Sequence, residues 1–243
     1  MPELKMLVDA VSSSRFISAE KSEVLIRKIS SLASRYEENE LTARIFAAER
    51  IKGDNGKIFL ISDAANQAIN RGKKISFQYY DYLPTKEKVL RHGGEVYILS
   101  PYALIWSDDR YYLVGYSDKR EALAAFRIDR MTIPKILDEP AVENTSFDPA
   151  DYTNKVIHMY SGPEQLVTLR CENGQMRSVI DKFGEDIRVE IEDEGHFLAE
   201  VKVQASPTFY AWVFQFGGDI RIAGPADVRK EFLAMAQKAL HGK

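Results

Sequence analysis

The change in hydrophobic period at Lys73 constrains the fold of this 243-residue chain more than any other feature of its sequence. Before Lys73, apolar residues recur at helical spacing; in "PELKMLVDAVSS", for example, Leu4 and Val11 lie on one face of a helix. After it, apolar and polar residues alternate, and "KKISFQYYDY" places Ile75 and Phe77 on the same side of a strand. The chain is therefore expected to change from helices to a sheet at this position.

Helix signals continue through the first 72 residues. "SAEKSEVLIRKISSLASRYEENE" carries an apolar stripe and begins at Ser18, a typical N-cap. "SDAANQAINRG" is typical of a third short helix, with Ser62 as its cap and Gly72 as its end. These patterns predict an α-helical region over residues 1–72. Because the first helix pattern begins almost at Met1, we expect a further segment to precede it in the whole protein.

The middle of the chain is expected to form short antiparallel strands. "KEKVLRH" and "EVYILSPYALIW" are typical of a hairpin around Gly93 and Gly94. Asp108 and Asp109 are expected to make a tight turn, and "DKRE" a polar turn between "RYYLVGYS" and "ALAAFRIDRM". Several short strands joined by tight turns predict a small β-barrel or a strongly bent sheet over residues 73–140.

A stretch rich in proline and small polar residues, "IPKILDEPAVENTSFDPADYTNKV", is typical of a linker or irregular crossover. After it, strand and helix patterns follow in the order β-α-β-β-α-β and end in a further helix. This is the order of a ferredoxin-like unit, which we expect over residues 155–243. The predicted fold class is therefore α+β.

Charge and cysteine content limit the classes of function. The net charge of −3 argues against a wholly basic nucleic-acid binder, yet residues 73–137 carry 11 basic and 8 acidic side chains, whereas residues 138–243 carry 11 and 18. If the protein binds an anion, the middle of the chain is therefore where we expect the site. Cys171, the single cysteine, cannot form an internal disulfide, so we expect a plain buried thiol and a cytoplasmic location. No apolar run is long enough to predict a membrane span.

The sequence offers no pattern for catalysis. The four histidines, at positions 92, 158, 196 and 241, are scattered and lack the spacing of metal ligands. The chain contains no GxGxxG, GxxxxGK[ST] or GxSxG motif. We therefore expect no enzymatic activity, no catalytic residues, no metal and no cofactor.

Arginines and tyrosines on the predicted barrel remain as candidates for binding. In "AAFRIDRM", alternation places Phe126 inside and Arg127 outside. Arg130 has the inner parity, and because burying an unpaired arginine is costly, we expect it at the strand end or paired with a carboxylate such as Asp129 or Asp109. Arginine suits bidentate binding of phosphate, and tyrosine offers a face on which bases stack. The alternative is that the tyrosines fill the core and the arginines form internal ion pairs.

These strands resemble the WYL domain of bacterial transcriptional regulators. The motif that names the family corresponds to Tyr111-Tyr112-Leu113, with tyrosine in place of tryptophan. The segments "ISFQYYDY", "LSPYALI" and "FRIDRM" also match, and the resemblance covers residues 73–137. The run "FGGDIRIAGPADVRKEFLAMAQKAL" resembles the C-terminal extension that often follows WYL domains.

The resemblance implies both a fold and a function. It implies an Sm-like, SH3-type barrel over residues 73–140 that binds a negatively charged effector, with single-stranded nucleic acid, a nucleotide or a cyclic dinucleotide as candidates. It also implies a homodimer, with residues 1–72 as helical linker and dimerisation region, and duplex DNA binding only through an N-terminal winged helix-turn-helix, which is absent from this sequence. A structural or protein-interaction module without a small ligand is the alternative. The ligand-binding residues expected from the resemblance are Arg127, Arg130, Tyr79, Tyr80, Ser100, Tyr102, Tyr112 and Arg120.

Overall fold

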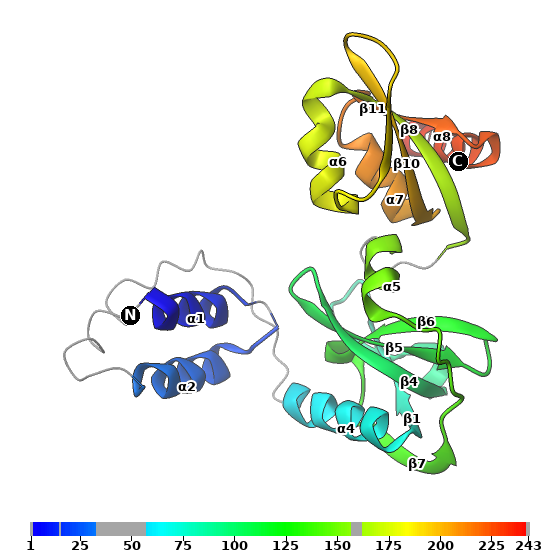
Figure 1. Ribbon diagram of the computed structural model, residues 1–243. Coiled ribbons are helices and arrows are strands. Elements are labelled where there is room, and N and C mark those ends of the chain that lie inside the picture. The colour runs from blue at the N-terminus through cyan, green and yellow to red at the C-terminus, as the bar shows by residue number, and fades with distance from the viewer. Residues whose placement is uncertain (1, 15, 33–56, 157–161, 242–243) are drawn as a thin grey trace. The chain divides into compact units, whose positions relative to one another are not determined.

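The computed structural model describes residues 2–14, 16–32, 57–156 and 162–241 (Figure 1). The chain divides into two compact units, residues 1–144 and residues 145–243. Each unit combines helices with an antiparallel sheet, so the predicted α+β class is confirmed. None of the helices in the described part of the chain is both long and apolar enough to cross a membrane.

Two paired helices open the first unit. They are α1 (Pro2–Ser13) and α2 (Ala19–Ser30), which pack against each other (Figure 1). Ser18 caps α2 as predicted, because its hydroxyl accepts a hydrogen bond from the backbone N–H of Lys21. The pair leaves apolar surface uncovered within the described residues; Met6 is 72% exposed. The predicted continuation of the second helix beyond residue 32 lies outside the described residues.

The next described helix, α4, runs from Ile58 to Arg71. Gly72 ends it in the left-handed conformation, with φ of 58°, as predicted. The predicted cap at Ser62 is wrong, because the helix begins four residues earlier and Ser62 lies inside it. Ile58 and Ile61 are each 1% exposed and extend the buried face of the helix, so packing rather than a capping side chain determines where it begins.

A five-stranded antiparallel sheet forms the body of the first unit. Its strands are β1 (Lys73–Gln78), β4 (Val96–Ser107), β5 (Arg110–Ser117), β6 (Ala122–Arg127) and β7 (Lys135–Pro140). They lie in the order β6-β5-β4-β1-β7, and α4 packs against β1 and β4 (Figure 1). The turn at residues 108–109 has φ angles of 50° and 59°, and residues 118–121 connect β5 to β6, both at the predicted places. The predicted linker began too early, since residues 135–140 pair with β1.

A small two-stranded sheet of β2 (Tyr80–Tyr82) and β3 (Lys88–Leu90) follows β1 along the chain. The predicted hairpin of β3 with β4 around the two glycines is therefore wrong. Arg91–Gly94, η1, joins β3 to β4 as an irregular turn, with left-handed backbone at His92 (φ 50°) and Gly93 (φ 67°). The turn that is used lies before β3, where the N–H of Leu83 donates to the carbonyl of Glu87 at 3.0 Å. This local turn, rather than the glycine pair, sets the pairing of β3.

The inner face of the first sheet follows the predicted alternation. Ile75, Phe77 and Tyr79 are 0%, 3% and 8% exposed, and they belong to one core with the buried side chains of α4. Strands β4 and β5 approach closely at Gly115, where an added Cβ would lie 2.2 Å from the carbonyl oxygen of Ser100. The residue at position 115 must therefore lack a side chain for the two strands to pair as they do.

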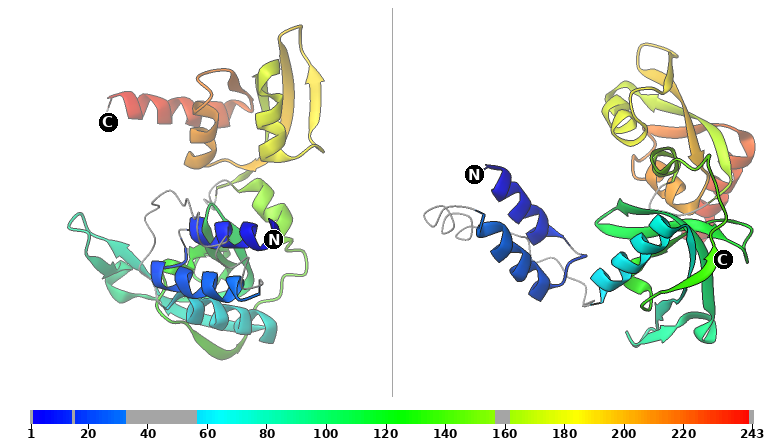
Figure 2. Two further views of the ribbon diagram at one scale, coloured as in Figure 1. Left: turned by 90° about the vertical axis from the view of Figure 1, so that its left-hand side faces the viewer. Right: turned by 60° about the horizontal axis from the view of Figure 1, so that its bottom comes forward.

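The second unit is built on a four-stranded antiparallel sheet. In chain order its elements are α5 (Pro149–Lys155), β8 (Glu164–Glu172), η3 (Asn173–Gln175), α6 (Met176–Phe183), β9 (Arg188–Ile191), β10 (His196–Gln204), α7 (Pro207–Phe214), β11 (Ile220–Gly224) and α8 (Ala226–His241). The strands lie in the order β11-β8-β10-β9, and α6 and α7 lie on the same face of the sheet (Figure 2). From β8 onward the elements occur in the predicted succession. Helix α5 was missed, although Asp148 caps it by accepting from the N–H of Ala150.

The core of the second unit is apolar and contains the single cysteine. Phe197, Phe209 and Leu169 are at most 2% exposed and pack in one cluster with Cys171. Burial raises the pKa of the Cys171 thiol to about 12, so this side chain is a protonated core residue. The prediction of a plain buried thiol is confirmed.

Candidate anion-binding site

A half-buried ion pair lies where β6 ends. Arg127 is the last residue of β6, and its guanidinium donates to both carboxylate oxygens of Asp129, from Nε at 3.1 Å and from Nη2 at 2.7 Å. The side chain of Arg127 is 22% exposed and that of Asp129 is 18% exposed. This two-pronged contact has the geometry in which arginine recognises carboxylates and phosphates.

Arg110, the first residue of β5, joins the same carboxylate. Its Nη1 donates to Oδ2 of Asp129 at 3.0 Å, and its side chain is 27% exposed. The pairing of β5 with β6 ends where Tyr112 lies opposite Arg127, and residues 128–130 then form a short 3-10 helix that leaves Asp129 within reach of the arginine at the start of β5. Two guanidinium groups thus share one carboxylate.

Arg130 lies just beyond the strand, in the short 3-10 helix η2 (Ile128–Arg130). Strand alternation therefore stops at Arg127, and the parity of Arg130 no longer forces it inward. In the part of the chain that the structure describes, Arg130 has no ion-pair partner, yet its charge acts on both Asp129 and Tyr79. We call Arg110, Arg127, Asp129 and Arg130 the arginine cluster.

The arginine cluster holds its acid and base in their charged forms. Burial alone would raise the pKa of Asp129, but the hydrogen bonds and charge of Arg127, with the charges of Arg110 and Arg130, hold that pKa below its usual value. Burial likewise opposes the charge of Arg127, while its hydrogen bonds to Asp129 raise its pKa above the usual value. Both groups stay ionised at neutral pH.

Two predicted tyrosines border the arginine cluster in different ways. Tyr79 is 8% exposed and packs against Phe126 in the core, and its hydroxyl accepts a hydrogen bond from the backbone N–H of Arg127 at 3.2 Å. Its ring therefore supports the cluster from below and has no face free for stacking. Tyr112 pairs directly with Arg127 across the two strands and is half-buried, which raises the pKa of its phenol.

Three further predicted residues take other positions. Ser100 is 1% exposed, and its hydroxyl accepts from the N–H of Val142 at 3.0 Å, which ties β4 to the segment after β7. Tyr80 pairs with Leu90 in the small two-stranded sheet. Tyr102 is half-buried on β4, and burial, with the nearby Tyr116 and Asp118, raises the pKa of its hydroxyl. Ser100 is thus a structural residue, while Tyr102 lies toward the β5–β6 turn.

Arg120 lies in the turn between β5 and β6, at the opposite end of these strands from Arg127. Its guanidinium carbon is 5.9 Å from the centroid of the Phe126 ring, a cation–π distance. It borders a cavity of about 320 Å³, which is lined by His92 and by residues 95–98 and 117–120. We call this the turn cavity. The eight predicted site residues are therefore distributed over two regions of the five-stranded sheet, its core, and the small two-stranded sheet that holds Tyr80.

Sequence reasoning missed Arg110, although a signal for it was present. The turn "DKRE" places Ser117 opposite Ala122. Counting away from this turn along both predicted strands, backward in the first and forward in the second, brings Arg110 opposite Asp129. The prediction considered Asp129 and Asp109 as partners of Arg130, whereas the structure gives Asp129 to Arg127 and Arg110. Cross-strand register, rather than residue type, was the information that had been left unused.

One group in the second unit has the spacing of a metal site within the described residues. Carboxylate oxygens of Glu192 and Asp193 and a ring nitrogen of His196 lie within 4.8 Å of one another. Arg170 already binds these acids, with Nε 2.6 Å from Glu192 and Nη2 3.6 Å from Asp193. The group is therefore explained as a surface ion-pair network, and we assign it no metal.

Comparison with known proteins gives the family. Residues 61–136 match the WYL domain, and residues 163–240 match the WCX domain. The chain belongs to the WYL-domain proteins and carries a WCX domain after its WYL domain, which confirms the resemblance predicted from the sequence.

Two solved structures are similar to this chain. One is proteasome accessory factor B/C (PafBC) of Arthrobacter aurescens, with 20% identity over 76% of this chain and 27% of that chain, and a TM-score of 0.33. The other is a CRISPR Cas-related protein, with 15% identity over 93% of this chain and 59% of that chain, and a TM-score of 0.44. The present chain thus spans less than two thirds of either protein. No curated protein matches it.

Proposed function

We propose that this chain is the ligand-sensing and dimerisation portion of a bacterial transcriptional regulator. In this proposal the WYL domain binds a negatively charged effector, single-stranded nucleic acid or a nucleotide such as a cyclic dinucleotide, and binding controls DNA recognition. The observation that carries the proposal is the gathering of Arg110, Arg127 and Arg130 around the carboxylate of Asp129.

Charge supports an anion as the ligand. Within the described residues, Arg110 and Arg127 bind the Asp129 carboxylate and the charge of Arg130 also acts on it, so the four residues of the arginine cluster carry three positive charges and one negative charge. Phosphate groups of a nucleotide chain supply the matching charge and accept paired hydrogen bonds from arginine. Tyr112, directly across from Arg127, adds an aromatic ring on which a base can stack.

The position of η2 suggests how binding is transmitted. Asp129 fills the two-pronged contact of Arg127, so an incoming phosphate competes with it. Displacing Asp129 changes η2, which packs against both β5 and α4. Because α4 belongs to the helical region, a shift of η2 can bias that region between two arrangements. The effector then acts by preferring one arrangement.

The remaining parts of the proposal concern the whole protein. Duplex DNA is bound by an N-terminal winged helix-turn-helix outside this sequence, the protein is cytoplasmic, and the chain is not an enzyme. Homodimerisation through residues 1–72 is supported by apolar side chains left exposed there, among them Met6, Leu7 and Leu60 at 72%, 51% and 58%. We also propose an Sm-like barrel for the first sheet and a ferredoxin-like fold for the second, which its strand order β11-β8-β10-β9 supports.

The test is the binding of a short labelled oligothymidylate to the full chain, measured by the fluorescence anisotropy of the label. Arg130→Gln is the informative variant, because Arg130 has no ion-pair partner among the described residues and its loss leaves the Arg127–Asp129 pair in place. We expect about fivefold weaker binding and a salt dependence reduced by about one unit of slope. Arg188→Gln is the matched control, because that side chain is 73% exposed in the second unit. Equal affinity of wild type and Arg130→Gln would exclude the arginine cluster.

A second candidate function is a structural or protein-interaction module without a small ligand. The closed contact between Arg127 and Asp129 favours it, since this pair satisfies an arginine internally. The two functions differ at Arg130. A structural module predicts no saturable binding of oligothymidylate or cyclic dinucleotides, and no effect of Arg130→Gln beyond that of Arg188→Gln.

A further inference from the structure

We infer that the turn cavity is a second binding site, and that it takes a small, singly charged organic anion with an apolar body, of the aromatic monocarboxylate class. The site goes beyond the proposed effector function, since it uses none of the residues of the arginine cluster. It lies at the other end of the β5–β6 hairpin, against the beginning of β4.

The first support is the apolar wall of the cavity. Val96 and Ile98 are 56% and 42% exposed although they are large aliphatic side chains, and both line the cavity. Tyr97 also lines the cavity, and its half-buried ring, on the opposite face of the strand from these two side chains, stacks on Phe77. Exposed apolar side chains gathered in a concavity are the usual floor of a small-molecule site.

The second support is the balance of charge around the cavity. Both carboxylates of its wall already contact a lysine: Glu95 pairs with Lys119, and Asp118 lies 2.6 Å from Nζ of Lys74. Lys74 is shared with Glu139, which lies 3.5 Å from the same Nζ. Glu95 also lies 3.2 Å from Nδ1 of His92. The hydrogen bonds from Lys119 and then His92 lower the pKa of Glu95, so its pair with Lys119 persists at neutral pH.

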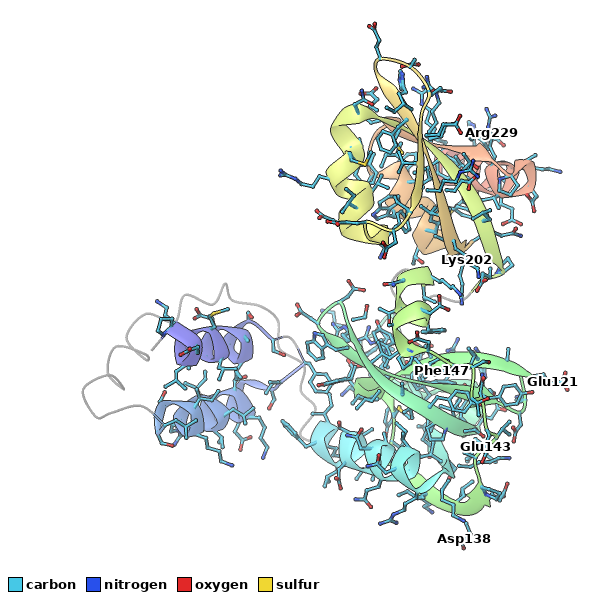
Figure 3. The ribbon with its side chains drawn as sticks, in the orientation of Figure 1. Glu121, Asp138, Glu143, Phe147, Lys202 and Arg229 are labelled. Carbon is cyan, nitrogen blue, oxygen red and sulfur yellow. The ribbon has the colours of Figure 1, made fainter. Side chains whose placement is uncertain are left out.

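Arg120 is a cation at the cavity that takes part in none of these ion pairs. Within the described chain its guanidinium has no hydrogen bond or ion pair, and the Phe126 ring at 5.9 Å holds it at the cavity. The adjacent Glu121 does not neutralise it: Figure 3 shows the Glu121 side chain at the tip of the turn, directed away from the sheet. One cation without an ion pair in the described chain therefore borders a largely apolar cavity, whose two carboxylates both contact lysines.

A hydroxyl completes the polar side of the site. Ser117 lines the cavity, and its side chain makes no hydrogen bond to any described residue. Arg120 and Ser117 belong to one turn, in which the N–H of Arg120 donates to the carbonyl of Ser117 at 3.1 Å. Together they offer a carboxylate one charged donor and one neutral donor.

Size and charge define the class of ligand. A cavity of about 320 Å³ lies at the small end of ligand sites, and it fits one or two rings rather than a polymer. The two acidic side chains of the wall, Glu95 and Asp118, disfavour a ligand with several negative charges. A monocarboxylate with an aromatic body satisfies both conditions, whereas a nucleotide suits the arginine cluster.

The experiment uses 1-naphthoate as the probe and 1-naphthalenemethanol as its uncharged match. Both are titrated into the 15N-labelled full chain, and amide chemical shifts report the site and the affinity. Naphthoate is expected to shift amides of residues 95–98 and 117–120 and to bind at least about fivefold more tightly than the alcohol. Arg120→Gln should remove that preference, since it deletes the charge from an exposed turn without breaking an ion pair.

Arg130→Gln is the control that separates the two sites. It should leave naphthoate affinity unchanged while it weakens oligothymidylate, so either site can fail without the other. Three results would each overturn the inference: shifts confined to residues of the arginine cluster, equal affinity for naphthoate and the alcohol, or an Arg120→Gln protein that still prefers naphthoate.

Discussion

The two ends of the β5–β6 hairpin carry arginines in opposite situations. At one end, Arg127 and Arg110 are half-buried and share the carboxylate of Asp129. At the other, Arg120 is exposed, rests over an aromatic ring, and has no acid partner among the described residues, because the nearby acids pair with lysines. The same residue type on the same two strands is thus held in place at one end and available at the other.

Burial explains the difference. Where β6 ends, Arg127 and Arg110 are half-buried, at 22% and 27% exposed, so both bind a carboxylate that offsets their lost hydration. In the turn at residues 118–121 solvent supplies that hydration, and Arg120 needs no partner. A ligand that takes the two-pronged contact of Arg127 must therefore displace Asp129, whereas a ligand at the turn cavity meets a cation that has no ion pair to break among the described residues. The first end suits a switch, and the second suits simple binding.

The largest expected effect comes from a substitution that disrupts the sheet carrying both ends of the hairpin. Gly115→Ala places a Cβ 2.2 Å from the Ser100 carbonyl, so β4 and β5 must separate. We expect the free energy of unfolding of the first unit to fall by about 3 kcal/mol. Trp106 fluorescence during urea unfolding, in a Trp212→Phe background, reports this unit. Gly174→Ala, where a Cβ would contact nothing within 4 Å, is the control. Equal stability of the two variants would contradict the close approach.

The next largest effect should separate the ends. Asp129→Asn leaves Arg127 and Arg110 half-buried without their carboxylate, and we expect a loss of about 2 kcal/mol, less than for a fully buried pair. Asp118→Asn at the turn cavity is the matched variant, and its effect should be smaller because that side chain is 47% exposed. Urea unfolding at pH 7 measures both. If the two variants lose equal stability, the contrast in burial does not control the energetics.

Acid should remove the difference between wild type and Asp129→Asn. The folded-state pKa of Asp129 is lowered, so its contribution to stability is fully present above the unfolded value of about 3.9. It is lost as the pH falls through the lowered folded-state value, because the unfolded chain takes up the proton first. Urea unfolding of both proteins over a pH series should give a constant difference from pH 8 to about pH 5 that shrinks below about pH 4. A difference that persists at lower pH would place the effect outside the titration of Asp129.

Much of the scaffold of both ends could be predicted from the sequence. Strict alternation placed Phe126 inside and Arg127 outside, and the polar residues at 108–109 and 118–121 marked the turns, because strand period and turn chemistry are local properties. The family motif then selected the arginine-bearing strand. Arg110 could have been found from the register of the same hairpin.

The rest depended on contacts between distant segments. Tyr79 and Ser100 carry hydroxyls that suit a ligand, yet both hydroxyls accept hydrogen bonds from backbone N–H groups, those of Arg127 and Val142 respectively. The sequence did not predict that Arg120 lies apart from the arginine cluster, because this separation depends on where β6 ends and on the path of the turn between β5 and β6. Pairing of β7 with β1 likewise lies in tertiary packing, since its sequence is interrupted by proline and acidic residues.

The smallest expected effect sharpens the contrast from the side of the turn cavity. Glu95→Gln removes the carboxylate that pairs with Lys119, so the ammonium group of Lys119 becomes available as a second positive charge beside Arg120. Because Lys119 is 74% exposed, the gain is modest, and we expect naphthoate to bind about twofold more tightly. Oligothymidylate affinity should not change, because Glu95 makes no contact with the arginine cluster. Amide-shift titrations and anisotropy measure the two affinities. Weaker naphthoate binding would mean that Glu95 positions the ligand itself, and a parallel gain for oligothymidylate would mean that the two ends share one electrostatic field rather than forming separate sites.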